Sequence, residues 1–280
     1  MKEIMYSQSS VLIVSGLFIF MLLALEIGFR SSRRKQVRTT EAITQANAVL
    51  AAMLGLLALL LAFTFSAALQ RYEDRSQTVV AEANAIGTTY LRARLLPREM
   101  QDEVQALLRQ YLDVRIQGGR VDATDPALYE SLLNQGNLME AQLWNHAVRA
   151  AELDKSVVTS GLFIQSLNEL IDTSGTRNAA LNRHVPEIVL FLMFATIVLT
   201  TATLGYASGI AGHRVTLAAF LLLILIALVV YLIIDLDRPR RGVIQVSHES
   251  MLSLQQTMGA AQGHTSQAGR PPDASQGPRR

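Results

Sequence analysis

The chain contains no cysteine, and this absence removes several kinds of chemistry at once. Disulfide bonds, thiolate zinc sites, iron–sulfur clusters and a cysteine nucleophile all require that side chain. Charged residues are also scarce, at 17% of the 280 residues, and the formal net charge is only +2. Because no stripe of Lys and Arg is interleaved with aromatic side chains, nucleic acid is not an expected partner.

Recognisable catalytic and cofactor motifs are missing as well. The sequence has no serine nucleophile elbow, no Walker loop and no Rossmann fingerprint. Gly205, Gly209 and Gly212 lie close together in GYASGIAG, but no strand precedes them, and we interpret them as the short turn between two membrane spans. The five histidines are far apart, and none has a second metal ligand at a suitable spacing: His146, His184, His213, His248 and His264. We therefore expect no enzyme activity, no cofactor and no metal site.

Apolar residues, in contrast, are abundant and gathered into long runs. A helix needs about 20 mostly apolar residues to cross roughly 30 Å of hydrocarbon at a rise of about 1.5 Å per residue. Four runs meet this requirement, at about Ser10–Phe29, Val49–Leu69, Glu187–Tyr206 and Val215–Ile234. The first run carries Glu26 four residues before Arg30, which is the spacing of a helical ion pair. It is too long for a secretory signal and lacks a small-residue cleavage site, so we interpret it as a retained span.

The orientation of the spans is predicted by the distribution of basic residues. The first loop holds five of them and a single acid, Glu41, which favours a cytoplasmic first loop by local charge density. The basic residues of this loop are Arg30, Arg33, Arg34, Lys35 and Arg38. Arginines also flank the opposite ends of the spans, and by the positive-inside rule these favour the opposite orientation.

Residues 70–184, between the second and third spans, have a helical pattern throughout. We expect the second span to continue as one unbroken helix from Gln70 to about Leu96, and Pro97 to open the next helix. Gly118 and Gly119 should end that helix. A third helix should follow, with Asp125 as its N-cap and Pro126 in its first turn, and a fourth should start near Lys155. No segment shows the strict alternation typical of a strand.

These features predict an all-α integral membrane protein of four transmembrane helices, with a helical-bundle insert between the second and third spans. Residues 1–69 should hold the first two spans and residues 70–184 the soluble insert. Residues 185–258 should hold the last two spans and a membrane-edge segment. Residues 259–280 are rich in Gly, Gln, Ser and Pro, and we expect a disordered tail there. No internal repeat is visible, so an inverted-repeat transporter is not supported.

The second span has small residues at helical spacing: Ala48, Ala51, Ala52, Gly55, Ala58, Ala62 and Ser66. Such a stripe lets helices approach closely, and helix packing is the first interpretation. The alternative is that this helix lines a pore in an oligomer. In that case Leu59, Phe63 and Ser66, which share a helix face, are the candidate pore-facing residues, and they would form an apolar constriction.

Two charged clusters lie at the predicted membrane edge. QRYEDR leaves the second span and IIDLDRPRRG follows the fourth, and together they supply Arg71, Glu73, Arg75, Asp235, Asp237, Arg238, Arg240 and Arg241. Because four spans in series place both clusters on one side of the membrane, we expect Asp235 and Asp237 to pair with Arg71 and Arg75. The clusters could form an ion-pair network or a vestibule that attracts anions.

The segments FTFSAALQRYEDR, VVAEANAIGTTYLRARLLP, RHVP and IIDLDRPRRGVIQVS resemble the bestrophin-like domain family of bacterial membrane proteins. The resemblance extends from the first span to about Leu254. It implies four transmembrane helices, a helical insert and a place in the bacterial inner (cell) membrane. Bestrophins themselves are pentameric anion channels whose second helices line the pore, with the termini and middle region in the cytoplasm. The matching positions are Arg71, Tyr72, Glu73, Arg75, Glu82, Asn84, Gly87, Tyr90, Arg92, His184, Pro186, Asp235, Asp237, Arg238, Pro239, Arg240 and Gly242.

Besides an enzyme or carrier, which no catalytic constellation or pair of broken helices supports, two functions remain open from the sequence. The chain could form a homo-oligomeric channel for small anions, with the lipid bilayer and further copies of itself as partners. Alternatively, it could be a non-conducting membrane scaffold or signalling anchor whose helical insert binds a partner. Oligomeric state separates the two, because a pore lined by one helix per copy needs a closed ring.

Overall fold

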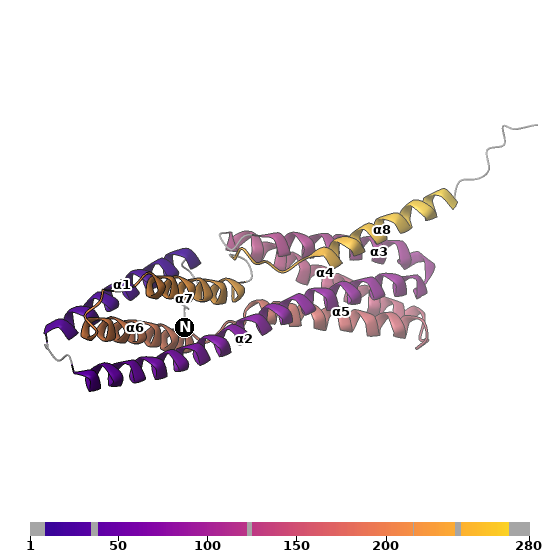
Figure 1. Ribbon diagram of the computed structural model, residues 1–280. Coiled ribbons are helices and arrows are strands. Elements are labelled where there is room, and N and C mark those ends of the chain that lie inside the picture. The colour runs from indigo at the N-terminus through magenta and orange to yellow at the C-terminus, as the bar shows by residue number, and fades with distance from the viewer. Residues whose placement is uncertain (1–8, 35–38, 122–124, 215, 239–241, 269–280) are drawn as a thin grey trace, which may run out of the picture. The chain divides into compact units, whose positions relative to one another are not determined.

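The computed structural model describes residues 9–34, 39–121, 125–214, 216–238 and 242–268. All regular structure in these residues is helical, as the sequence predicts (Figure 1). The helices are α1 (Ser10–Arg34), α2 (Thr40–Arg92), the 3-10 helix η2 (Ala93–Leu95), α3 (Arg98–Arg120), α4 (Pro126–Leu153), α5 (Ser160–Leu181), α6 (Glu187–Ile210), α7 (Leu217–Leu236) and α8 (Glu249–Ala268).

Four helices are long and apolar enough to cross a membrane, namely α1, α2, α6 and α7. The four predicted spans are therefore confirmed. Helices α1 and α2 are longer than their apolar runs. Charged side chains at the end of a span can reach the membrane interface, so they do not break the helix. In α1 the predicted ion pair is present, with 2.6 Å between Arg30 Nε and Glu26 Oε1.

Helix α2 is far longer than a single span. It continues without a break from Thr40 to Arg92 and then tightens into η2, so the predicted continuation beyond Gln70 is confirmed. Leu96 is extended, with ψ of 162°, because the residue before a proline is disfavoured in the α conformation. The chain forms two compact units, which α2 joins. The first comprises Met1–Asp74 and Leu181–Val246, and the second comprises Arg75–Ala180 and Ser247–Arg280.

In the first unit, α1 and α6 meet backbone to backbone. A Cβ atom on Gly28 would collide with the carbonyl oxygen of Ala202, and one on Gly205 would collide with that of Leu25. A Cβ on Gly209 would likewise collide with the Ser32 side chain. Small residues at such contacts let helices approach closely in a membrane, where packing drives association.

The interpretation of Gly205 and Gly209 as turn residues is therefore wrong. Both lie inside α6, which ends at Ile210, and only Gly212 is in the turn, where its φ is +80°. The four-residue spacing of Gly205 and Gly209 places both on one helix face. Helix α6 thus continues beyond the predicted span and includes two glycines that composition alone would assign to a loop.

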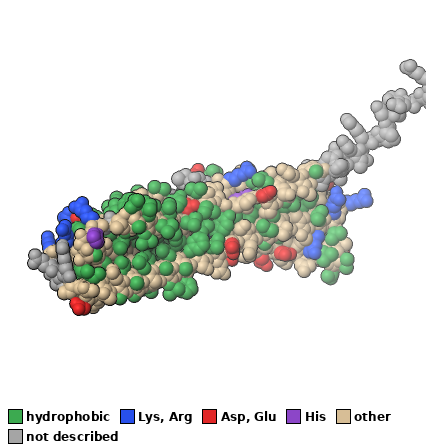
Figure 2. Space-filling model, in the orientation of Figure 1, with side chains coloured by type: hydrophobic (Ala, Val, Ile, Leu, Met, Phe, Trp, Pro, Cys, Tyr) green, Lys and Arg blue, Asp and Glu red, His purple; other side chains and the backbone are tan. Residues whose placement is uncertain are grey.

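The core of the first unit is built from α1, α2, α6 and α7. Met21, Leu57, Met193, Ile197, Leu223, Val230 and Ile233 are among its buried residues. Many large apolar side chains of the same helices instead face outward, including Phe20, Phe191 and Leu225, each more than half exposed. Figure 2 shows hydrophobic side chains over much of the outer surface of this unit. Such a surface suits hydrocarbon as the surrounding solvent.

In the second unit, the starts of α3 and α4 follow the predicted local signals. Pro97 precedes α3, and the Asp125 side chain accepts a hydrogen bond from the Leu128 amide at 3.0 Å at the start of α4. Helix α5 starts at Ser160, five residues later than predicted from Lys155. The intervening residues form a turn around Asp154, where the Thr159 hydroxyl donates to the carboxylate and lowers the pKa of Asp154.

Helix α8 is an element that the sequence did not predict. It carries regular helix through Ala268, whereas composition predicts a disordered tail from Gly259; residues 269–280 lie outside the described part of the chain. Met251 and Met258 are buried, and Leu254 lies over Gly87 of α2. The Gln255 amide donates to Asp113 of α3 at 2.6 Å. These contacts stabilise the helix where intrinsic propensity is weak, because helices in proteins depend mainly on packing.

Candidate functional site

The membrane-spanning part of α2 is the least covered of the four spans. Only 11% of its most apolar stretch is buried within the chain, compared with 28% for α1 and 33% each for α6 and α7. Leu59 and Phe63 are 52% and 66% exposed, and Ser66 is exposed on the same face. Leu57 and Ala68, on the opposite face, are buried in the core. The three candidate pore residues therefore lie together on an outward-facing surface, and their lining of a pore stays a prediction.

The small-residue stripe of α2 shares this outward orientation. All seven of its residues are exposed: Ala48, Ala51, Ala52, Gly55, Ala58, Ala62 and Ser66. A Cβ atom added at Gly55 would meet no atom within 4 Å. Packing within the described chain thus gives no reason for a glycine there. The threonines of α6 behave differently, because Thr196 and Thr200 are buried and donate to carbonyl groups of their own helix.

At the end of α7, Asp235 holds a tight reversal of the chain. Its two carboxylate oxygens accept hydrogen bonds from the backbone amides of Val243 at 3.1 Å and Ile244 at 2.9 Å. A Cβ on Gly242 would lie 2.8 Å from the carbonyl oxygen of Asp235, so the reversal requires glycine. Asp235 is 2% exposed, and these amides give both of its buried carboxylate oxygens a hydrogen-bond partner.

Asp237 and Arg238 connect the ends of three helices in the first unit. The Asp237 carboxylate accepts a hydrogen bond from the Val185 amide just before α6, at 2.9 Å. Nδ1 of His184 lies 3.2 Å from the Asp237 carbonyl oxygen. Arg238 donates to the Ser10 hydroxyl at the start of α1, at 3.2 Å. This cluster therefore fastens α1, α6 and α7 at one end of the unit.

The other residues of the predicted charge network that the structure describes are Arg71, Glu73 and Arg75. Arg71 donates to the carbonyl oxygen of Ala67, one turn earlier in α2, and Glu73 is exposed. In the second unit, Arg75 is buried and donates to the Ala180 carbonyl oxygen at 3.4 Å. Arg240 and Arg241 lie outside the described residues. Pairing of Asp235 and Asp237 with Arg71 and Arg75 stays a prediction.

A buried carboxylate bridges three helices of the second unit. Glu82 of α2 is fully buried, and its two oxygens accept from Arg115 Nε of α3 at 2.5 Å and from Arg177 Nη1 of α5 at 2.6 Å. Both arginines are also buried. Charges removed from water are tolerated only when they are paired and hydrogen-bonded, as they are here. We call Glu82, Arg115 and Arg177 the charge lock.

Further side chains surround the charge lock. The Arg115 guanidinium lies 6.0 Å from the ring centre of Tyr111, whose hydroxyl donates to Glu140 at 2.7 Å. Burial disfavours the charged form of Arg115, but the acidic groups around it, with the Glu82 carboxylate first, together outweigh this and raise the pKa of Arg115 above its ordinary value. Burial also raises the pKa of Tyr111, so its phenol stays neutral and can donate. Such fixed protonation states suit a structural role.

The charge lock extends to the segment that precedes α8. Nη2 of Arg177 lies 3.2 Å from Nε2 of His248, and the His248 ring occupies the space that a side chain at Gly119 would need. Sequence reasoning missed this cluster because the partners of Glu82 are 33 and 95 residues away. A signal was present, however: Glu82 lies on the same helix face as the apolar residues Val79 and Ile86, and a carboxylate on a buried face needs a cation.

Among the described residues, no group of three or more His, Asp or Glu side chains could hold a metal ion.

The profile of the Bestrophin-like domain matches residues 15–251, which is most of the chain. The chain belongs to the Bestrophin-like domain family. The resemblance found in the sequence segments is thereby confirmed. No curated protein is similar enough in sequence to be matched.

Solved structures with the same fold come from bacterial membrane proteins. A bacterial bestrophin homologue from Klebsiella pneumoniae, solved by Zn-SAD phasing, is 17% identical, with a TM-score of 0.62 over 89% of this chain and 97% of that chain. A second structure of that homologue, carrying a point mutation, has a TM-score of 0.64 and 17% identity over 90% of this chain and 98% of that chain. At this identity the likeness shows the fold.

Proposed function

We propose that the chain is a subunit of a homo-oligomeric channel for small anions in the bacterial inner membrane, with α2 of each copy lining the pore. The observation that carries this proposal is the poor coverage of α2, at 11% against 28–33% for the other spans. The outward face is also the one that bears the small-residue stripe. A second helix could approach this face closely, as small residues allow in membranes.

Identical copies that use such a face form a closed assembly if the rotation between neighbours closes the ring. Leu59 and Phe63 would then meet their counterparts around the axis as an apolar neck, with Ser66 one turn further along. Apolar constrictions of this kind gate by losing their water. Anions are the proposed cargo because the family resemblance implies them and because Arg71 lies at the exit of the span.

The second unit is the proposed soluble insert of this channel, and it comprises most of residues 70–184 together with α8. The buried charges of Glu82, Arg115 and Arg177 are paired within the unit, and its surface carries charged residues of both signs. The charge lock fixes α2, α3 and α5 relative to one another. A rigid insert of this kind would hold the end of the pore helix in one position.

The mass of the assembly in nanodiscs, measured by native mass spectrometry, tests the proposal. A ring of three or more copies is expected, because one helix per copy cannot enclose a pore in a monomer or dimer. Reconstitution into liposomes should then give anion flux. A monomeric mass would contradict the proposal.

A non-conducting scaffold is the second candidate, and one observation favours it. The only tryptophan of the chain, Trp144, is 39% exposed on α4, one turn from the exposed Val148. Exposed tryptophan is enriched at protein interfaces. A monomeric or dimeric mass without flux would favour this candidate, and Trp144→Ala should then weaken binding of the partner while leaving the fold intact.

A further inference from the structure

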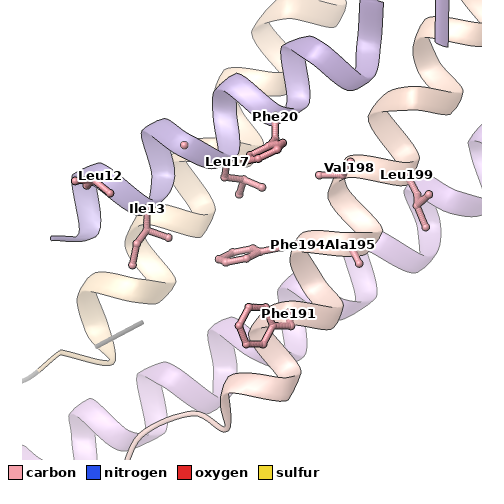
Figure 3. Close-up of a pocket in the computed structure, with 10 residues that line it drawn as sticks. Leu12, Ile13, Leu17, Phe20, Phe191, Phe194, Ala195, Val198 and Leu199 are labelled. Atoms are coloured by element: carbon pink, nitrogen blue, oxygen red, sulfur yellow. The ribbon is translucent and has the colours of Figure 1, made fainter. Parts of the chain in front are cut away.

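An apolar groove runs between α1 and α6 in the membrane-spanning unit. Figure 3 shows side chains of the two helices on either side of it. Its volume is about 660 Å³, within the range of ligand pockets, and every residue that lines it is apolar. The lining includes Leu12, Gly16 and Phe20 from α1, and Phe191, Ala195 and Leu199 from α6.

The groove follows from the way the two helices pack. They run in the same direction, because Gly28 of α1 contacts Ala202 of α6, and further along both helices Ser32 contacts Gly209. Glycines bring their backbones into contact in these later turns. Towards the start of both helices, bulky side chains such as Phe194 stand between them, so the helices separate and leave the groove. It therefore occupies only the half of the span at which α1 and α6 begin.

We propose that one acyl chain of a membrane phospholipid occupies this groove. The groove is continuous with the lipid-facing surface, because its rim residues Leu12, Phe20 and Phe191 are 60%, 63% and 52% exposed. No lining side chain offers a polar partner that would hold water. An unfilled apolar groove would also forfeit dispersion contacts along its walls.

The length of the groove agrees with this occupant. The walls extend over residues 12–20 and 191–199, which correspond to about 12 Å of helix at about 1.5 Å per residue. The hydrocarbon of one leaflet is about 15 Å thick, half of the whole core. A helix from a second copy fits less well, because close helix contacts in membranes use small residues, whereas phenylalanines project around this groove.

Filling the groove tests the proposal. A Cβ at Gly16 meets no atom within 4 Å, so Gly16→Leu and Ala195→Leu can place methyl groups in the groove without a clash at the backbone. Ala218→Leu on α7 is the matched control, because Ala218 is exposed and lies outside the groove. Native mass spectrometry of protein extracted in mild detergent should show retained phospholipid for the natural chain and the control. Each filled variant should retain about tenfold less, since the loss of about two buried methylene contacts has that effect.

A second measurement uses the natural chain and does not depend on variants. In vesicles that contain phosphatidylglycerol with a diazirine on its acyl chain, photocrosslinks should concentrate in residues 12–20 and 191–199. Crosslinks spread evenly over the outer surface, or equal lipid retention by filled and control variants, would overturn the proposal. Disulfide formation between copies that carry Phe191→Cys would also overturn it and identify a protein occupant.

Discussion

The two units of the chain hold their helices together by different contacts. In the first unit, Gly28 and Gly205 bring α1 and α6 into backbone contact, and the charged residues lie towards helix ends. In the second unit, a fully buried carboxylate, Glu82, joins α2, α3 and α5 through two arginines. The first unit therefore has an apolar outer surface, and its buried charges Asp235, Asp237 and Arg238 lie at the end of α7, whereas the second has charge at its centre.

The difference agrees with the proposal that the first unit lies in lipid and the second in water. Lipid offers no hydrophobic driving force between helices, so close packing of small residues must supply the stability. In water, burial of apolar residues supplies the stability, and a paired buried charge can select one arrangement of helices. The outward face of α2 departs from this pattern, because it is small-residue surface without a partner helix among the described residues of the first unit.

The largest expected effect is on the charge lock. Glu82→Ala leaves two buried arginines without their carboxylate, and we expect a loss of about 3–5 kcal/mol in the free energy of unfolding. Chemical denaturation of the purified protein measures this loss. Glu73→Ala, an exposed position on the same helix, is the control and should change the stability little. Equal stability of the two variants would show that the lock does not hold the second unit together.

A smaller effect is expected at the glycine contact of the first unit. Gly205→Ala forces a methyl group against the backbone of Leu25, and we expect a loss of about 1–3 kcal/mol from overpacking. The control is Gly16→Ala, where the methyl group meets open space and helix propensity improves. Unfolding in SDS titrations compares the two. If Gly205→Ala were as stable as Gly16→Ala, backbone contact between α1 and α6 would not be the stabilising feature.

The smallest effect is expected at the chain reversal after α7. Asp235→Asn keeps one acceptor for the amides of Val243 and Ile244 but places an NH₂ group against the other, and it should cost about 1 kcal/mol. The exposed Asp74→Asn is the matched control in the same titration. If Asp235→Asn lowered the free energy of unfolding more than Glu82→Ala does, the buried charge of the first unit would contribute more to stability than that of the second.

Local signals allowed much of the fold to be predicted from the sequence. Pro97 and the Asp125–Pro126 pair act within one helical turn, so their effect can be read directly, and the apolar runs located the spans. Helix α8 was missed because its composition is rich in Gln, Ser and Gly. Met251 and Met258, which dock the helix, are only two residues in that background.

Features that depend on distant contacts were not predictable in the same way. The charge lock needs Arg115 and Arg177, whose proximity to Glu82 arises only after three helices assemble. Gly205 and Gly209 were assigned to a turn because glycine is common in turns, although their four-residue spacing within an apolar run also fits a helix contact. The outward face of α2 was foreseen as a candidate, since the small-residue spacing is visible without any partner.

The most direct test of the proposed pore uses the absence of natural cysteine. A single cysteine is placed at Ser66 on the outward face of α2, or at the exposed Leu192 on α6 as the control, and anion flux is measured in liposomes before and after a charged thiol reagent. If α2 lines the pore, the reagent blocks flux through Ser66→Cys and leaves flux through Leu192→Cys unchanged. Absence of anion flux, or flux that responds equally at both positions, would contradict a pore lined by α2.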